Sequence, residues 1–465
     1  MKDFFKYVLV VIVCLSCMLI FNFALEPSIV SIQKGESNGI YDTYILKYSN
    51  GKSDTITIKN GENGEDLSLQ ELYEATKIAK GYGDEYTMLD FIDEYLSLSI
   101  EEKDESKAYL GALSTVAVYS TFPTYVDLTA KKAYGVSIGS GVIYQTAGDS
   151  DNFYIITNYH VLYNKNSLRS DKMSEKYTCF LFGSNVEVNA TQITGGYSVS
   201  YGSDAIDCAY VGGSMENDIA VLKVKDSSRI TNSNAKPVKV YDGDPVMGQS
   251  IVAIGNSEGK GISVTKGVIS VDSEYQSMLA CDDETQITFR AMRIDAAVNS
   301  GNSGGGVFDT NGKLVGIVNS KIIKDGVEGM VFALPATLST RIIDNIIENS
   351  SETNKSAIKP TLGITAKIAS SKAEYDSESK GVKILEEVVV DTISDNSICE
   401  DLKSGDKIVS VIVSGKEYII DRFYKLKDLT WIMKKGSVVI FNVIRANNPV
   451  TISVVMSNNS YSTVK

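Results

Sequence analysis

Between about residue 110 and residue 318 the sequence consists of short runs of β-branched and aromatic residues, separated by Gly, Asn and Asp. Branched side chains fit the pleated surface of a strand, whereas the separating residues favour turns. Because no long helical patterns interleave with these runs, the pattern predicts a β-barrel or a β-sandwich. The predicted strands are residues 116–119, 136–144, 153–157, 219–224, 251–255, 267–271, 287–293 and 314–318.

A helix and a second, smaller module follow this β-rich region. Apolar residues recur at helical spacing over 335–348, and Pro335 suits a first helical turn. Residues 349–359 are polar and predict a linker. In the last hundred or so residues the pattern predicts a mixed module of strands and one helix. The first strand is expected to begin at 362–364, the others lie at 382–389, 408–413 and 438–445, and the helix lies at 426–433.

The N-terminus predicts a membrane anchor. Residues 7–25 are almost wholly apolar and follow Lys2 and Lys6. A helix of about 19 residues reaches across most of a hydrocarbon core, and a positive flank stays on the cytoplasmic side. We therefore expect an uncleaved single-pass anchor with the bulk of the chain outside the cytoplasm. A removed signal peptide is the alternative, although no clear cleavage site follows the apolar run.

Residues 26–108 predict a small α+β spacer without chemistry of its own. Residues 41–47 and 55–59 read as two strands of a hairpin, with Asn50-Gly51 between them as the turn signal. Two short helices are predicted to start near Ser68 and Thr87, each with an acidic residue three positions later.

Charge and composition narrow the classes of function. The net charge of −13 weighs against nucleic acid as a partner, because phosphate binding requires clustered Lys and Arg. The chain has one histidine and six scattered cysteines, so neither a metal site nor a cofactor is expected. Cys179 and Cys208 allow a disulfide within one domain, with buried free thiols as the alternative reading.

Three residues of the β-rich region suit nucleophilic catalysis. Ser303 has glycines close on both sides and precedes a strand-like run, so a tight turn can expose its hydroxyl. A hydroxyl needs a base with a pKa near roughly 6.5 and an orienting carboxylate. His160 ends one apolar strand and Asp218 directly precedes another. Taken singly, the Ser303 segment could be a flexible loop, His160 a structural histidine and Asp218 an ordinary turn residue. Together they favour a catalytic set.

At these residues the sequence resembles the HtrA (Deg) serine proteases. The resemblance covers roughly residues 110–460 and rests on 157–161, 217–222 and 295–305, with further matches at 139–143, 253–256, 263–267, 362–364 and 402–408. It implies a mainly β fold: a chymotrypsin-like double β-barrel followed by an α+β PDZ domain, in addition to the N-terminal membrane helix and the α+β spacer. The resulting domain prediction is 1–25 anchor, 26–108 spacer, 109–348 trypsin-like protease domain, 349–359 linker and 360–460 PDZ domain.

The resemblance also implies the roles of the site residues. His160 is expected to act as general base and then general acid, Asp218 to orient it, and Ser303 to attack the peptide carbonyl. The amides of Gly301 and Ser303 are expected to form the oxyanion hole. Ser300 is the alternative nucleophile. It has a glycine only after it, however, and the family pattern places the catalytic serine at position 303.

A substrate pocket is expected from Ala297 and from the segment that contains Ile317 and Asn319. No acidic residue lies in residues 315–320, and Ala297 stands where trypsin-like enzymes keep a pocket aspartate. We therefore expect small or medium apolar residues before the cleaved bond.

The resemblance finally implies regulation and partners. Leu362, Gly363 and Ile364 are expected to hold the C-terminal carboxylate of an unfolded or misassembled polypeptide, which would add as a strand; a degenerate module that only packs on the barrel is the alternative. The family assembles as trimers, so a homotrimer is expected.

The leading hypothesis is an extracytoplasmic, ATP-independent endopeptidase for unfolded or damaged exported proteins. A poorly cleaving chaperone or peptide-binding protein and a processing protease for one surface partner are the alternatives.

Overall fold

The computed structural model describes residues 29–37, 41–48, 53–59, 107–319, 330–376 and 381–464, with a few single residues between 74 and 83. The predicted anchor at 7–25 and most of the two predicted spacer helices lie outside these residues. Within the described part of the chain, no helix is long and apolar enough to cross a membrane. The chain divides into two compact units, Met1–Ser99 and Ile100–Lys465.

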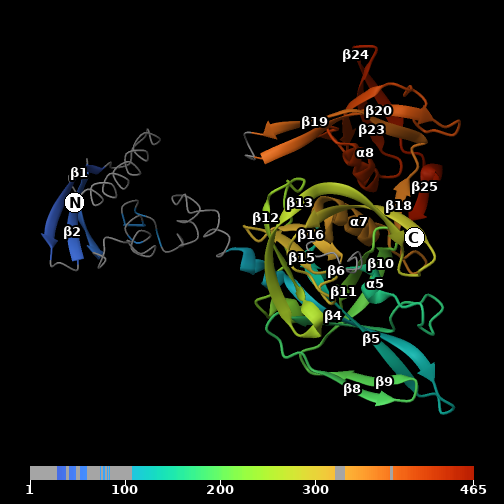
Figure 1. Ribbon diagram of the computed structural model, residues 1–465, viewed down its shortest axis with the longest axis horizontal. Coiled ribbons are helices and arrows are strands. Elements are labelled where there is room, and N and C mark those ends of the chain that lie inside the picture. The colour runs from blue at the N-terminus through green and yellow to red at the C-terminus, as the bar shows by residue number, and fades with distance from the viewer. Residues whose placement is uncertain are drawn as a thin grey trace. The chain divides into compact units, whose positions relative to one another are not determined.

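The first unit contains a three-stranded antiparallel sheet (Figure 1). Its strands are β1 (Ile29–Ser37), β2 (Tyr41–Tyr48) and β3 (Ser53–Lys59), in that order. The pairing of β2 with β3 confirms the predicted hairpin. Strand β1 was not expected from the sequence, and it pairs with the other side of β2.

The second unit begins with a barrel. A 3-10 helix, η1 (Ala108–Ser114), leads into it. Strands run in the order β4-β7-β10-β11-β6-β5, and the additional pairing of β4 with β5 closes the ring, while the β8–β9 hairpin extends from β5. The strands are β4 (Thr115–Val126), β5 (Lys132–Tyr144), β6 (Tyr154–Thr157), β7 (Lys176–Leu181), β8 (Val188–Ile193), β9 (Gly196–Tyr201), β10 (Ile206–Ser214) and β11 (Ile219–Val224); the short helices are α5 (Tyr159–Leu162) and α6 (Ser228–Thr231).

A second closed barrel follows, in the order β12-β13-β14-β17-β16-β15. Its strands are β12 (Ser250–Asn256), β13 (Ile262–Leu279), β14 (Gln286–Ile294), β15 (Gly306–Asp309), β16 (Leu314–Asn319) and β17 (Val331–Pro335), with the short helix η2 (Ser257–Gly259) after β12. Two barrels of mainly β structure confirm the predicted fold class for this part of the chain.

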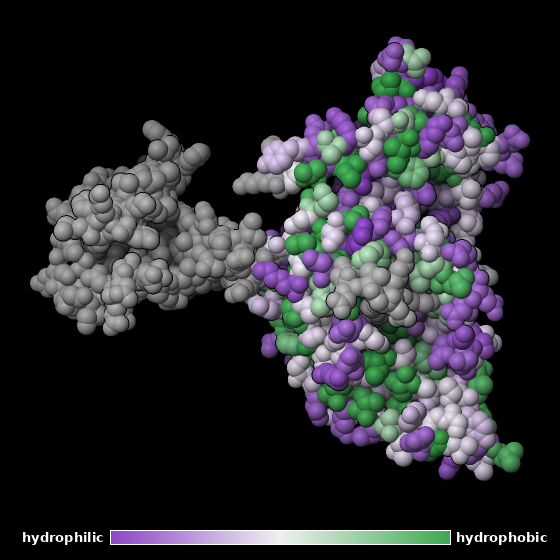
Figure 2. All heavy atoms as spheres, in the orientation of Figure 1, coloured by the Kyte–Doolittle hydropathy of each residue, from purple (hydrophilic) through white to green (hydrophobic). Residues whose placement is uncertain are grey.

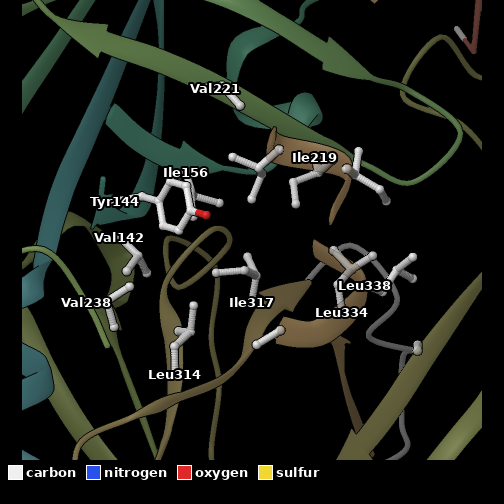
Figure 3. Close-up of a cluster of buried hydrophobic side chains, with 14 of the residues drawn as sticks. Val142, Tyr144, Ile156, Ile219, Val221, Val238, Leu314, Ile317, Leu334 and Leu338 are labelled. Atoms are coloured by element: carbon white, nitrogen blue, oxygen red, sulfur yellow. The ribbon is translucent and has the colours of Figure 1, made fainter. Parts of the chain in front are cut away.

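One hydrophobic core joins the two barrels and the helix α7 (Ala336–Asn349). Figure 3 shows Ile156 and Ile219 of the first barrel facing Ile317 and Leu334 of the second, with Leu338 of α7 beside them. Burying such apolar surface is the main stabilising contribution to a fold of this kind. The shared core fixes the barrels against each other, and therefore fixes any site built from both of them.

The C-terminal module has its own core and a sheet in the order β19-β20-β21-β23-β24, with β22 paired to β21. Its elements are β19 (Ile364–Asp376), β20 (Gly381–Ile393), β21 (Lys407–Val413), β22 (Lys416–Ile419), α8 (Phe423–Leu429), η4 (Thr430–Ile432), β23 (Val438–Arg445), β24 (Asn448–Val455) and η5 (Asn458–Ser460). The helix predicted at 426–433 therefore begins earlier and ends as a 3-10 turn.

Part of the predicted linker is structured. Strand β18 (Ala357–Pro360) pairs with β25 (Tyr461–Val464), which brings the end of the chain back beside the start of the C-terminal module. Buried Arg290 of β14 meets buried Asp428 of α8 at 3.0 Å, so a charged pair joins the second barrel to this module. Figure 2 shows hydrophilic and hydrophobic side chains mixed over one face of these domains.

Candidate active site

The register between β6 and β11 brings His160 and Asp218 together. Ala220 pairs with Thr157, so the turn before β11 lies beside the residues that follow β6. The side chain of Asn158 donates to the carbonyl oxygen of Asp218 at 2.9 Å and fixes the two segments to each other. His160 then falls in α5, where its backbone N–H donates to Asp218 Oδ1 at 2.9 Å.

The three predicted catalytic side chains form one continuous chain of hydrogen bonds. His160 Nδ1 lies 2.6 Å from Asp218 Oδ2, and His160 Nε2 lies 2.9 Å from Ser303 Oγ. Asp218 and Ser303 are buried, at 6% and 3% exposure, whereas the His160 side chain is 20% exposed. This arrangement can take a proton from the serine hydroxyl and stabilise the resulting imidazolium.

A further residue holds the aspartate. Asn319, at the end of β16, donates through Nδ2 to Asp218 Oδ2 at 2.9 Å. Asp218 itself has a φ of 48°, which is a left-handed conformation that non-glycine residues seldom adopt. Strained backbone of this kind persists only where surrounding contacts enforce it. The bonds from Asn158, His160 and Asn319 supply that enforcement.

Ser303 is presented by a turn that only glycine fits. Gly304 has a φ of 83°, and a Cβ there would come within 2.3 Å of the carbonyl oxygen of Ser140. Ser140 N donates in turn to the carbonyl oxygen of Ser303 at 2.8 Å. The turn therefore packs against β5 of the first barrel, which places the serine between the two barrels.

The backbone ahead of Ser303 is fixed by two contacts. Ser140 Oγ donates to the carbonyl oxygen of Gly301 at 2.7 Å, and the same hydroxyl accepts from Asn256 N. The carbonyl oxygen of Ser300 accepts from Glu258 N at 2.7 Å. Since a trans peptide sets its N–H opposite its C=O, the N–H of Gly301 points away from η2. Ser300 is exposed, and the hydroxyl that meets His160 is that of Ser303.

The predicted pocket residues differ in exposure. Ile317 is fully buried in the shared core (Figure 3), so its side chain does not face solvent. All six residues of β16 are buried, which leaves none of its side chains facing solvent. Asn319 contacts Asp218 instead. Ala297 is exposed, and its carbonyl oxygen accepts from Thr265 Oγ1 at 2.8 Å.

The predicted peptide-binding residues lie at the edge of the C-terminal sheet. The carbonyl oxygen of Leu362 accepts from Ser397 Oγ at 2.9 Å, and that of Gly363 accepts from Ser394 N at 2.8 Å. The trans peptides therefore direct the N–H groups of Gly363 and Ile364 away from the segment that holds the carbonyls. Strand β19, which begins at Ile364, is an edge strand of its sheet and can accept an added strand.

The cysteines do not form disulfides in the described structure. Cys179 and Cys208 are buried free thiols, and the Cys208 thiol donates to Cys179 Sγ across 3.5 Å. Among the described residues, no group of three or more His, Cys, Asp or Glu side chains is placed to hold a metal ion. Next to His160, burial raises the pKa of Tyr159, so this phenol stays neutral at ordinary pH.

Comparison with known proteins defines the class of this domain. Residues 139–317 match the family model of the trypsin-like peptidase domain. The chain is also 30% identical over 307 residues to "Serine protease HtrA-like" of Staphylococcus aureus strain USA300, and 31% identical over 309 residues to that of strain MRSA252. Each alignment covers 64% of this chain and 35% of the relative, so the chain spans about a third of the length of these relatives. The second unit thus carries a trypsin-like peptidase domain.

Solved structures to which the chain is similar include HtrA-type proteases. Among solved structures, it is similar to the HtrA-type protease AlgW with decapeptide, at 21% identity and a TM-score of 0.43, over 77% of this chain and 98% of that one. It is also similar to the serine endoprotease from Yersinia pestis, at 20% identity and a TM-score of 0.39, over 80% of this chain and 100% of that one.

Two contributors to the site were missed from the sequence. Ser140 was noted only as part of the matching segment 139–143, although its hydroxyl links the serine loop to β12. Asn319 was assigned to a pocket, although it bonds Asp218. The signal that could have found Asn319 is an amide side chain at the end of an otherwise apolar strand, because a buried amide requires a hydrogen-bonding partner.

Proposed function

We propose that the chain is an ATP-independent serine endopeptidase that cleaves polypeptides through Ser303. The observation that carries the proposal is the hydrogen-bonded series from Asp218 Oδ2 through His160 to Ser303 Oγ, at 2.6 and 2.9 Å. Those distances fall within the range at which a base can take the proton of a nucleophile.

Peptide hydrolysis then follows in two balanced steps. Ser303 Oγ attacks the scissile carbonyl carbon while His160 Nε2 accepts the hydroxyl proton, and the imidazolium then protonates the leaving amine as the C–N bond breaks. Water attacks the acyl-enzyme with His160 again as base, and the acid product leaves with Ser303 regenerated. The amides of Gly301 and Ser303 are the proposed oxyanion donors, each contributing about 3 kcal/mol in the transition state.

We infer a preference for small or medium apolar residues before the cleaved bond. The support is the exposed Ala297 on the loop before Ser303 and the lack of an acidic residue in the sequence of 315–320. An Arg or Lys side chain would find no partner charge there. Cleavage of a peptide library chiefly after Arg or Lys would contradict this preference.

We further propose that the C-terminal module is a PDZ domain that binds exposed apolar C-termini and stimulates cleavage, in a homotrimer. The N–H groups of Gly363 and Ile364 suit a carboxylate, and the open edge of β19 suits an added strand.

The apolar run at 7–25 behind Lys2 and Lys6 supports a location outside the cytoplasmic membrane, where the substrates would be unfolded or damaged exported proteins.

Covalent labelling tests the catalytic proposal directly. A fluorophosphonate probe should label the full chain on Ser303, as mapped by mass spectrometry of its fragments. His160→Ala should reduce the labelling rate by at least about a hundredfold, since general-base catalysis contributes on that scale. Ser300→Ala is the matched control and should label normally. Labelling on Ser300, or none on the parent chain, would sink the proposal.

A further inference from the structure

Strands β19 and β20 form a long hairpin that continues past the other strands of the C-terminal module (Figure 1). Each strand has 13 residues, and the two pair over their whole length. On its other side, β20 pairs with β21 only at Val389. The far half of the hairpin, residues 370–376 and 381–387, is therefore a two-stranded arm with no third strand beside it in the described part of the module.

The outer edge of β19 is open along this arm. Strand β19 is an edge strand of its sheet, and all residues from Lys367 to Tyr375 are exposed. The register of β19 with β20 shifts only before Ser370, so the arm itself is a regular pair of strands. A two-stranded hairpin is marginally stable in water, and a third strand would pair the open N–H and C=O groups of its edge.

The two faces of the arm differ near its end. Tyr375 lies opposite Val382 and Ala373 opposite Ile384, so these four residues share one face. Tyr375 is 67% exposed and Val382 43%, although Val388, on the same face of β20, is fully buried in the core of the module. The opposite face is mostly polar and carries Ser370, Lys372, Glu374, Lys383, Leu385 and Glu387.

The position of the arm along β19 determines which part of a bound polypeptide it would meet. The N–H groups proposed to hold a C-terminal carboxylate are those of Gly363 and Ile364, at the start of β19. A polypeptide anchored there by its C-terminus runs antiparallel to β19, so its earlier residues lie farther along the strand. Ser370 and Asp376 are six and twelve residues beyond Ile364. The arm would therefore lie beside residues about six to twelve positions before the C-terminus, since opposed strands rise by nearly equal amounts per residue.

We propose that the arm extends the peptide site, by binding the segment six to twelve residues before the C-terminus of a polypeptide as a third strand. The arm would favour a segment in which apolar and polar residues alternate, because the apolar side chains would then lie beside Ala373 and Tyr375. The inference rests on the proposed function, because it takes the N–H groups of Gly363 and Ile364 as the carboxylate site. It assigns to that site a ligand class, the amphipathic C-terminal strand of an unfolded polypeptide.

The test measures binding of fluorescent peptides to the full chain carrying Ser303→Ala, by fluorescence anisotropy. A peptide long enough to reach the end of the arm, with an alternating upstream segment, is compared with a short peptide made of its own C-terminal residues. The long peptide should bind at least about tenfold more tightly, because several cross-strand pairs add their contributions. A second long peptide, with the alternation shifted by one residue, should lose this gain, because such a shift turns every side chain to the other face.

Two variants and a scan of the peptide backbone identify the arm as the contact. Tyr375→Ser should reduce the ratio of the two affinities about threefold or more, whereas Lys372→Ser, on the opposite face of the same strand, should keep it. Single N-methyl groups in the upstream segment should weaken binding at every second position only, because alternate N–H groups of a strand face its neighbour.

The outcomes separate the inference from the proposed function. Equal affinities of the short and long peptides would overturn the inference and leave the proposed carboxylate site standing. If neither peptide binds, the carboxylate site fails and the inference fails with it. A gain that shows no alternation in the N-methyl scan, or that is unchanged in Tyr375→Ser, would place the upstream residues elsewhere and overturn the inference alone.

Discussion

Asn319 donates a hydrogen bond of 2.9 Å to the same carboxylate oxygen, Asp218 Oδ2, that meets His160 Nδ1 at 2.6 Å. Asn319 comes from β16 of the second barrel, whereas Asp218 and His160 belong to the first. The contact therefore orients a carboxylate of one barrel from the other.

Removal of this bond should slow the chemical step. We expect Asn319→Ala to lower kcat about tenfold with little change in KM, because the aspartate loses an orienting partner worth about 1.5 kcal/mol. The measurement is steady-state kinetics on one quenched peptide. Asn459→Ala, at an exposed position of η5, is the control and should leave both constants unchanged. A rise in KM alone would assign Asn319 to substrate binding instead.

Ser140 should act on the serine loop from a distance. Its hydroxyl joins Gly301 O to Asn256 N, and the residue is fully buried. Ser140→Ala leaves both partners short of a bond, so we expect a loss of about 1–3 kcal/mol in unfolding free energy. The N–H of Gly301 would also be less well oriented, which should reduce kcat per labelled site about tenfold. Unchanged kcat per fluorophosphonate-reactive molecule would show that the hydroxyl is structural only.

Gly363 and Gly405 form a matched pair for testing the peptide site. Both have left-handed φ values, 73° and 87°, but a Cβ on Gly363 would lie 2.5 Å from Ser397 Cα, whereas nothing lies within 4 Å of one on Gly405. Valine at either position should destabilise the module by about 1–2 kcal/mol. Only Gly363→Val should weaken binding of a peptide with an apolar C-terminus, by at least about tenfold. Equal affinity in both variants would favour a module that only packs on the barrel.

The Arg445–Asp406 pair should make the stability of the C-terminal module depend on pH in the acid range. The hydrogen bonds from Arg445, at 2.7 and 2.8 Å, hold the pKa of the buried Asp406 carboxyl below its ordinary value of 3.8. A lowered folded pKa means that this stabilisation is complete above the unfolded value and is lost as pH falls through the folded one. Arg445→Met should therefore cost about 2 kcal/mol at pH 7 and progressively less below pH 4.

Denaturant unfolding at pH 7 and pH 3 measures this difference. The single tryptophan, Trp431, lies in η4 of the module and provides the fluorescence signal. Lys407→Met removes a more exposed pair with Glu387 on the neighbouring strands and should change stability by less than about 1 kcal/mol. A loss in Arg445→Met that is the same at both pH values would contradict the assignment to Asp406.

Eight of the barrel strands and the three catalytic candidates could be predicted because their signals are local, whereas β7, β8, β9, β10 and β17 were not predicted. Branched residues, glycine turns and polar residues at strand ends are visible within a few positions of the sequence. The triad needed only the order of these segments and the family resemblance. What brings His160 and Asp218 together is the β6–β11 register, and that register follows from two neighbouring apolar runs.

The remaining features depend on residues far apart in the chain. Ser140 and Gly301 are separated by 161 positions, and Asn319 and Asp218 by 101, so no local pattern predicts either bond. The burial of the Ile317 side chain could not be predicted because β16 is buried on both faces and lacks the alternation that separates core from surface. Strand β18 has four residues, one of them proline, and forms only because the end of the chain returns to pair with it.

The most direct test of the central claim compares the full chain with its Ser303→Ala form on unfolded casein, with and without a peptide that ends in apolar residues. The account predicts that only the parent cleaves and that the peptide accelerates cleavage. Cleavage by Ser303→Ala at the parental rate would contradict the assigned nucleophile. If neither form cleaves under any condition while both bind casein, the chain is a binding protein rather than a protease.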